Sequence, residues 1–292
     1  MKFEFMTTSD AYHYTIEFLC EHLGVSKSGF YAWKKGRGYR SEKEHREYEL
    51  VRKIEAIHLG SKRVYGSPRV YGILQGLEPD VSLSKVERLM KKNNIRSKTK
   101  KKFKVTTDSK HNFKIVPNHL MQDFTAQRPD QVYVTDITYV PTKQGFLYLC
   151  TVLDVFSRKV VGWTLENNMR AEMVKKALEL AYKSRGAGEY VIVHSDRGVQ
   201  YASSLVRDYL DSKKAIRSMS RKGNCWDNSM MESFFGRFKT EHMYWENYAT
   251  HDEARRKIFE WIEIEYNRKR VHTALGNVSP TQFEEDKMAK AA

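Results

Sequence analysis

Three acidic residues occupy positions from which they could act together on a phosphate group. Asp136 interrupts an apolar, β-branched run, Asp196 ends a second such run, and Glu232 follows in a helical stretch. A buried carboxylate without a partner costs several kcal/mol, so such an acid needs a hydrogen bond, an exposed face or a cation. Hard divalent cations prefer oxygen ligands, and two of them about 3.5 to 4 Å apart can activate a nucleophile and stabilise a leaving oxygen.

The spacing of these acids does not by itself establish a site, because a chain with 36 Asp and Glu in 292 residues repeats it by chance. A structural reading of each acid therefore stays open. Asp154, at the end of a neighbouring apolar run, is a rival metal ligand. His194 lies two residues before Asp196, so it could orient that acid or a phosphate, or simply pack in the core.

The elements that must position the acids follow a mixed pattern. Short β-branched and aromatic runs predict strands, and apolar residues at helical spacing predict helices. The predicted strands are 132–140, 146–156, 160–165 and 190–196. The predicted helices are 171–185, 203–213, 227–241 and 252–266. We expect an antiparallel meander, then a helix and a further strand, which together make a mixed sheet covered by helices and an α/β class.

The N-terminal part predicts two helical units. Apolar residues from Ile16 to Leu23 form one stripe, and Gly24 ends that helix. Ser26 then caps a second short helix that offers Lys27 and Ser28 near its start, as in a DNA-binding helix-turn-helix. A helical hairpin that binds nothing shows the same pattern, so that reading stays open.

A second unit is expected around residues 67–90, where Ser67 and Pro68 predict an N-cap and first helical position. A charged helix over 41–59 is predicted to connect the two units. Its apolar residues and the stripes of the second unit are core in either reading.

Charge points to a polyanionic partner. The chain carries 51 Lys and Arg against 36 Asp and Glu, a net of +15, and residues 1–120 account for +12 of it. Residues 91–104 hold eight basic and no acidic side chains. We expect Lys100, Lys101 and Lys102 in this run to contact DNA phosphates, with a solvated linker as the alternative. A membrane-surface helix is disfavoured, because the run has no periodic apolar face.

Composition excludes several classes of protein. The longest apolar stretch, 146–153, is far shorter than the roughly 20 residues of a membrane-spanning helix. The three cysteines are scattered, so neither a zinc cluster nor a disulfide framework is expected. No export signal is visible at the N-terminus, and a bacterial, cytoplasmic protein without a membrane partner is expected, associated with the nucleoid when bound to DNA.

Five longer motifs are far more specific than the acids alone. They are LGVSKSGFYAW at 23–33, VYGSPRVY at 64–71, HSDRGVQY at 194–201, KGNCWDNSMMESFFGRFK at 222–239 and YNRKRVHTAL at 266–275. Together they resemble the second-frame (OrfB-type) product of the IS-three family of insertion sequences. That family is a branch of the retroviral-integrase (DDE) superfamily of transposases.

The resemblance implies a ribonuclease-H-like integrase catalytic core with Asp136, Asp196 and Glu232 as catalytic metal ligands. It implies two Mg²⁺ ions, with Mn²⁺ as a substitute, and places the family's basic residue on Lys239. Lys222 and Asn228 are further expected DNA contacts, although Asn228 and Trp226 could instead shape the loop before the helix. The zinc module of retroviral integrases has no counterpart here.

The expected domains are a helix-turn-helix at 1–40, a second helical DNA-binding region with a basic linker at 41–122, the core at 123–270 and a tail at 271–292. The expected function is transposition: binding of the element's terminal inverted repeats, metal-dependent strand cleavage and transfer to target DNA. By resemblance, such proteins act as homo-oligomers on paired ends, often with a first-frame OrfA-type product. A catalytically silent DNA-binding regulator and a nuclease without a joining step are the rival functions.

Overall fold

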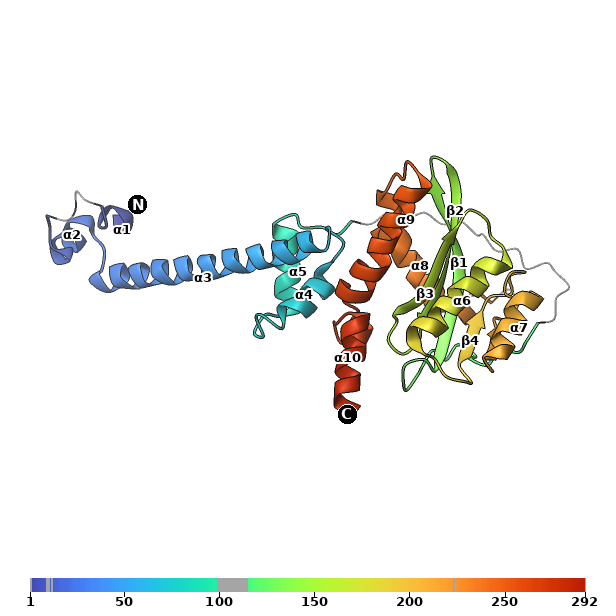
Figure 1. Ribbon diagram of the computed structural model, residues 1–292. Helices are drawn as coiled ribbons and strands as arrows, with labels where there is room; N and C mark the ends of the chain where they lie inside the picture. Colours follow the sequence, from blue (N-terminus) through green and yellow to red (C-terminus); the bar gives the residue numbers. More distant parts are fainter. Residues whose placement is uncertain (1, 9–10, 12, 99–114, 223, 292) are drawn as a thin grey trace.

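The computed structural model describes residues 2–8, 11, 13–98, 115–222 and 224–291. A small helical unit lies at one end of a long helix, and two short helices pack on its other end (Figure 1). A sheet with helices on both faces forms the largest part. No helix in these residues combines the length and apolar character needed to cross a bilayer.

The sheet has five strands in the order β3-β2-β1-β4-β5. Their bounds are β1 Val132–Thr142, β2 Gly145–Asp154, β3 Val160–Glu166, β4 Ile192–Ser195 and β5 Ile216–Met219. The first three form the predicted antiparallel meander, and β4 and β5 run parallel to β1. The sequence analysis missed β5, because four residues with two polar side chains give no recognisable strand pattern.

Helices cover both faces of the sheet (Figure 1). One face packs against α8 (Ser229–Glu241), α9 (His251–Phe259) and the π-helical segment Glu260–Lys269 that continues α9. The other face packs against α6 (Ala171–Arg185) and α7 (Ser204–Ser212). Gly162 on β3 permits the close approach of α6, because a Cβ there would lie 2.3 Å from the Ala177 carbonyl oxygen. The predicted mixed sheet between helices is therefore confirmed.

The N-terminal unit differs from the prediction in the length of its second helix. Helices α1 (Lys2–Phe5) and α2 (Ile16–Leu23) come first, α2 ends at Gly24 with a φ of 62°, and Ser26 caps the next helix as expected. That helix, α3, runs without a break from Lys27 to Gly60, so the predicted short helix and the predicted 41–59 helix are one. Glycine lowers helix propensity by about 1 kcal/mol but does not end a helix as proline does, and no proline lies in this stretch.

The second helical region packs α4 (Ser67–Leu74) and α5 (Leu83–Lys92) against the C-terminal half of α3. Helix α4 is preceded by Gly66 at its N-cap, one residue before the predicted Ser67. Polar contacts join this region to the sheet domain, and two of them lie near the start of α4. The Arg69 guanidinium donates to the Glu241 carboxylate over 3.1 Å, and the Tyr65 hydroxyl accepts from the Val271 N–H over 3.0 Å.

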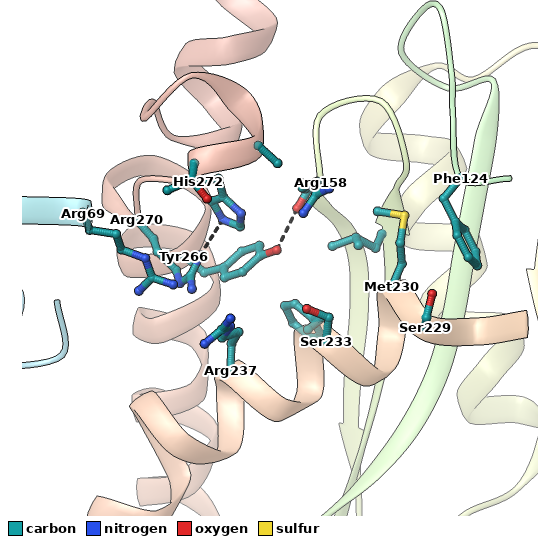
Figure 2. Close-up of a pocket in the computed structure, with 14 residues that line it drawn as sticks. Arg69, Phe124, Arg158, Ser229, Met230, Ser233, Arg237, Tyr266, Arg270 and His272 are labelled. Atoms are coloured by element: carbon teal, nitrogen blue, oxygen red, sulfur yellow. Dashed lines mark hydrogen bonds between the residues drawn. The ribbon is translucent and has the colours of Figure 1, made fainter. Parts of the chain in front are cut away.

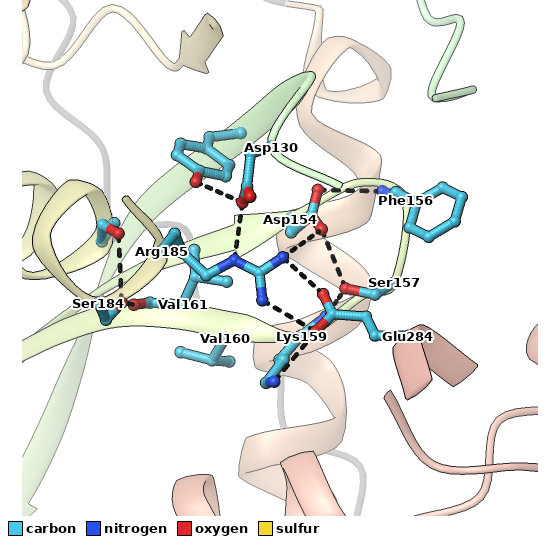
Figure 3. Close-up of polar contacts among 12 residues, drawn as sticks. Asp130, Asp154, Phe156, Ser157, Lys159, Val160, Val161, Ser184, Arg185 and Glu284 are labelled. Carbon is cyan, nitrogen blue, oxygen red and sulfur yellow. Dashed lines mark hydrogen bonds and ion pairs between the residues drawn. The ribbon is translucent and has the colours of Figure 1, made fainter. Parts of the chain in front are cut away.

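The expected C-terminal tail contains a helix, α10 (Pro280–Ala291), that is tied to the sheet domain. Figure 3 shows the contact: Arg185 at the end of α6 donates to both oxygens of the buried Glu284, over 2.9 and 3.0 Å, and to Asp130 over 2.7 Å. The pKa of Glu284 is lowered, because its hydrogen bonds with Arg185 and Ser157 outweigh the opposing effect of burial. The sequence analysis missed α10 because its apolar residues are few.

His242, just after α8, gives the fold a pH dependence. Its ring lies nearly parallel to that of Trp261 and has a buried Nε2 without a hydrogen-bond partner among the described residues. Burial lowers its pKa to about 4, an effect that Glu246 and Glu265 oppose and that Lys62 and Lys257 reinforce.

Because the unfolded chain binds this proton more readily than the native state, stability should be fully present above pH 6.5 and fall as the pH drops from 6.5 to 4. In urea unfolding at pH 7 and pH 5, we expect His242→Gln to lose less stability than the wild type, by about 1 to 2 kcal/mol. His45→Gln, at an exposed position on α3, is the control and should behave as the wild type does. An unchanged pH dependence in His242→Gln would contradict the assignment.

Candidate active site

Asp136 and Asp196 lie on neighbouring parallel strands at the same level of the sheet. The register pairs Val132 with Ile192 and Val134 with His194, so its continuation sets Asp136 opposite Asp196, directly after the end of β4. Adjacent strands are about 4.8 Å apart. Side chains alternate along a strand, so Asp136 shares the face of Val132 and Val134, which is the face covered by α8.

Backbone donors hold both carboxylates. The Asp136 Oδ1 accepts from the Ile137 N–H over 2.8 Å, and the Asp196 Oδ1 accepts from the Gly198 N–H over 2.8 Å. Glycine is suited to position 198, because a Cβ there would lie 3.0 Å from the Asp196 Oδ1. The turn after β4 thus brings a backbone N–H close to the carboxylate.

Helix α8 brings Glu232 and Lys239 to the same face. The helix packs on β1 through Met231, Phe234, Phe235 and Phe238. Glu232 is exposed in its first turn, and Lys239 is half-buried in its last turn. Seven positions are nearly two turns of an α-helix, so these two side chains lie along one side of α8.

The four charges interact. The pKa of Asp136 is raised well above its ordinary value, first by burial and then by the negative charge of Asp196; Glu232 adds to the rise and Lys239 opposes it. Burial also raises the pKa of Glu232 and lowers that of Lys239. Lys239 thus offsets part of the effect that burial and the two other acids have on Asp136.

No group of three His, Cys, Asp or Glu side chains is arranged to hold a metal ion within the described ranges. The chemistry of the donors nevertheless fits a divalent cation. Asp136 and Asp196 present carboxylate oxygens side by side, each raises the cost of ionising the other, and a cation would relieve that cost. Glu232 is an exposed side chain on the adjacent helix, with rotamers still available to it.

The segment before α8 is fixed by Asp227, which the sequence analysis did not single out. Its buried carboxylate accepts from the Arg221 backbone N–H over 2.7 Å, from the Arg221 guanidinium over 2.9 and 2.8 Å, and from Gln122 over 3.0 Å. The hydrogen bond to the Arg221 guanidinium holds the pKa of Asp227 far below its ordinary value. Asp227 thereby anchors the start of the helix that carries Glu232.

Asn228 and His194 have structural contacts. Asn228 is buried, and its amide donates to the Thr135 carbonyl oxygen over 3.4 Å, so it ties α8 to β1. This burial disfavours the predicted DNA contact and supports the loop-shaping alternative. His194 is fully buried with Nδ1 2.8 Å from the Ser218 hydroxyl and Nε2 3.2 Å from the Ser220 hydroxyl, so it links β4 to β5.

Asp154 is rejected as a metal ligand beside Asp136. Asp154 on β2 pairs in register with Tyr133 on β1, which lies three residues before Asp136. Asp136 itself pairs with Thr151. Tyr133 belongs to the opposite face of the sheet. Asp154 is buried there, accepts from the Ser157 hydroxyl over 3.0 Å, and has a pKa raised by burial to about 7.

The other DNA-binding candidates are scattered. Lys222 is exposed near the start of α8, and Lys27 and Ser28 are exposed on the first turn of α3, where Lys27 pairs with Glu17. Lys100, Lys101 and Lys102 lie outside the described residues. Two further basic residues, Arg268 and Lys269, are also exposed, whereas the neighbouring Arg270 is buried and donates to both oxygens of Glu241.

The repulsion between Asp136 and Asp196 predicts a stability gain on removing one charge. Asp136→Asn keeps an oxygen for the Ile137 N–H and should raise the free energy of unfolding by about 1 kcal/mol at pH 7 in EDTA. Asp208→Asn, at the exposed Asp208 of α7, is the isosteric control and should change it by less. A destabilised Asp136→Asn, measured by urea unfolding, would contradict this account of the site.

Comparison with known domain families divides the chain as the structure does. The integrase core domain matches at residues 126–225 and again at 215–280, and an HTH-like domain matches at 45–103. The sheet domain is therefore an integrase core, as the resemblance implied. The second helical region matches the HTH-like domain.

Whole-chain relatives give the same result. The chain is 39% identical over 267 residues to the insertion element IS600 uncharacterized 31 kDa protein of Shigella sonnei, which covers 91% of this chain and 97% of that protein. It is 35% identical over 289 residues to transposase InsF for insertion sequence IS3A of Escherichia coli K12, which covers 99% of this chain and all of the relative.

Among solved structures, a simian T-cell lymphotropic virus intasome matches 79% of this chain and 74% of its own, with 14% identity and a TM-score of 0.47. The conclusion therefore follows from the domain matches and the whole-chain relatives: this chain belongs to the IS3-type family of insertion-sequence transposases, polynucleotidyl transferases that act in DNA transposition.

Proposed function

We propose that Asp136, Asp196 and Glu232 are the catalytic carboxylates of this transposase, and that they cleave a strand at the ends of its element and join the freed 3′-OH to target DNA. One observation carries the proposal: two carboxylates stand side by side on adjacent parallel strands, and the charges of Glu232 and Lys239 on α8 both act on the first of them. An integrase core in an insertion-sequence transposase is where such chemistry would take place.

Divalent metal is the expected cofactor. Asp136, Asp196 and Glu232 would hold two Mg²⁺ ions, or Mn²⁺ in their place. When bound, such ions neutralise charge at the scissile phosphate, activate the attacking oxygen and stabilise the leaving one. The observation that supports metal binding is the pair of neighbouring carboxylates of Asp136 and Asp196, the second of which raises the pKa of the first.

The chain's own residues bind and orient the DNA. Lys239, on the side of α8 that carries Glu232, is placed to hold a phosphate oxygen beside the acids. Cleavage forms a bond from water oxygen to phosphorus and releases a 3′-OH. Joining forms a bond from that 3′-OH to a target phosphorus and releases the target's own 3′ oxygen. Neither step requires a covalent bond to the protein.

DNA recognition falls to the helical regions and to exposed basic residues. The HTH-like region and the α2–α3 unit would bind terminal inverted repeats, with Lys27 and Ser28 at the start of α3 and Lys100, Lys101 and Lys102 on the connecting run. Lys222 would contact DNA beside the site. Action as a homo-oligomer on paired ends, alone or with a first-frame OrfA-type product, completes the proposal.

The test uses labelled duplexes that carry the terminal repeats of the element encoding this chain, incubated with the protein and Mg²⁺ or Mn²⁺. We expect both nicked and joined strands on sequencing gels. Binding without either product would favour the regulator instead. Nicks without joints would favour a plain nuclease.

Neutral replacements should separate chemistry from affinity. Asp136→Asn, Asp196→Asn and Glu232→Gln should each lower the rate of strand cleavage at least a thousandfold, which corresponds to about 4 kcal/mol in the barrier. Their DNA affinity should change less than threefold, because phosphate binding depends on basic residues. Asp208→Asn should cleave as the wild type does. Wild-type cleavage in any of the three variants would remove that acid from the site.

A further inference from the structure

A basic pocket lies beside the proposed active site, between the HTH-like region and the sheet domain. It has a volume of about 350 Å³ and is open to solvent. Its lining includes four arginines and three hydroxyl side chains: Arg69, Arg158, Arg237, Arg270, Ser229, Ser233 and Thr273. Figure 2 shows Arg69, Arg237 and Arg270 near one end of the Tyr266 side chain and Arg158 near its hydroxyl.

The positive charge of this pocket is only partly balanced. Glu241 accepts from Arg270 over 2.7 and 2.8 Å and from Arg69 over 3.1 Å. The side chains of Arg158 and Arg237 have no ion pair or hydrogen bond to any residue that the structure describes. Glu241 therefore pairs with two of the four guanidinium groups and leaves the other two without a carboxylate among the described residues.

The pKa of His272 shows the effect of the positive charges in the pocket. Burial lowers its pKa to about 2, and the charges of Arg270, Arg158, Arg69 and Arg237 all contribute to the lowering. His272 therefore stays neutral, and its Nε2 accepts from the Arg270 Nη1 over 3.0 Å. The two unpaired arginines are solvent-accessible, so they are available to an anion from outside the described residues.

The hydroxyl groups point to phosphate as that anion. Arginine binds phosphate oxygens through paired N–H donors, and hydroxyl groups can donate to the oxygens that remain. Ser229, Ser233 and Arg237 are spaced four residues apart and form a stripe on α8. This stripe lies about a quarter of a turn around the helix from Glu232 and Lys239.

We propose that this pocket binds a backbone phosphate of the DNA, separate from the phosphate that reacts at the carboxylates. The proposal rests on the proposed function for the identity of the ligand. Because Arg69 comes from α4 and Arg237 from α8, one bound phosphate contacts both the HTH-like region and the helix that carries Glu232. The pocket thereby sets the register between the bound repeat and the catalytic carboxylates.

The test compares the wild type with the double variant Arg158→Gln, Arg237→Gln. Its control, Lys175→Gln, Lys183→Gln, removes the same charge from α6 on the opposite face of the sheet. We expect the pocket variant to bind a terminal-repeat duplex about tenfold more weakly, with a salt dependence smaller by about 0.9 for one lost contact. The control should change neither quantity comparably. Equal effects in the two variants would reduce the pocket to general surface charge and overturn the proposal.

Single methylphosphonate substitutions locate the phosphate. At one position of the duplex, a neutral linkage should weaken wild-type binding but cause no further loss in the pocket variant. Inorganic phosphate tests the other source of the anion. The pocket variant could lose the binding of inorganic phosphate while keeping wild-type affinity for the duplex. That result would identify a free-phosphate site and overturn the proposal. If the pocket variant instead showed altered self-association without DNA and unchanged DNA affinity, the proposal would also be overturned. The pocket would then bind a carboxylate from a second copy of the chain.

Folding and chemistry are controlled separately. Removing two unpaired like charges breaks no ion pair, so the pocket variant should melt at or above the wild-type temperature; if it does not fold, the exposed Arg237→Gln alone is used. Asp196→Asn should retain the methylphosphonate-sensitive position while it loses cleavage. The wild type could fail to nick or join DNA and still bind more weakly when the methylphosphonate is at that one position. This result would refute the proposed function and leave the pocket assignment in place.

Discussion

The repulsion between Asp136 and Asp196 is the constraint around which the sheet domain is arranged. Parallel pairing of β1 and β4 sets the two carboxylates at neighbouring positions, and burial makes their ionisation more costly. Two backbone N–H groups and Lys239 offset part of that cost. The two apolar clusters on either side of the sheet contribute the favourable burial that offsets such a cost.

Helix α8 is the element that connects this constraint to the rest of the molecule. One side packs four apolar side chains on β1, a second carries Glu232 and Lys239, and a third lines the arginine pocket. Asp227 and Asn228 fix its first turn against Arg221 and Thr135. The position of Glu232 therefore depends on the ion pair between the buried Asp227, five residues earlier, and the partly exposed Arg221, as well as on its own side chain.

The sequence predicted the meander, helix α6 and the strand before Asp196, because each has a strong local pattern. The three acids follow instead from the resemblance carried by the longer motifs, and their catalytic role stays a prediction. The sequence could not predict that α3 continues past residue 41, since glycines weaken a helix without ending it. It also missed β5 and α10, which are held by long-range contacts such as Arg185 with Glu284. The arginine pocket was invisible for the same reason, because its arginines are separated by up to 201 positions in the chain.

The continuous helix α3 has a geometric consequence for a bound duplex. Thirty-four residues at about 1.5 Å each span roughly 50 Å. The α1–α2 unit lies at the N-terminal end of α3, and α4 and α5 pack against its C-terminal end (Figure 1). At about 3.4 Å of rise per base pair, straight B-form DNA lying parallel to α3 would extend some fifteen base pairs between the two ends, roughly one and a half turns of the double helix.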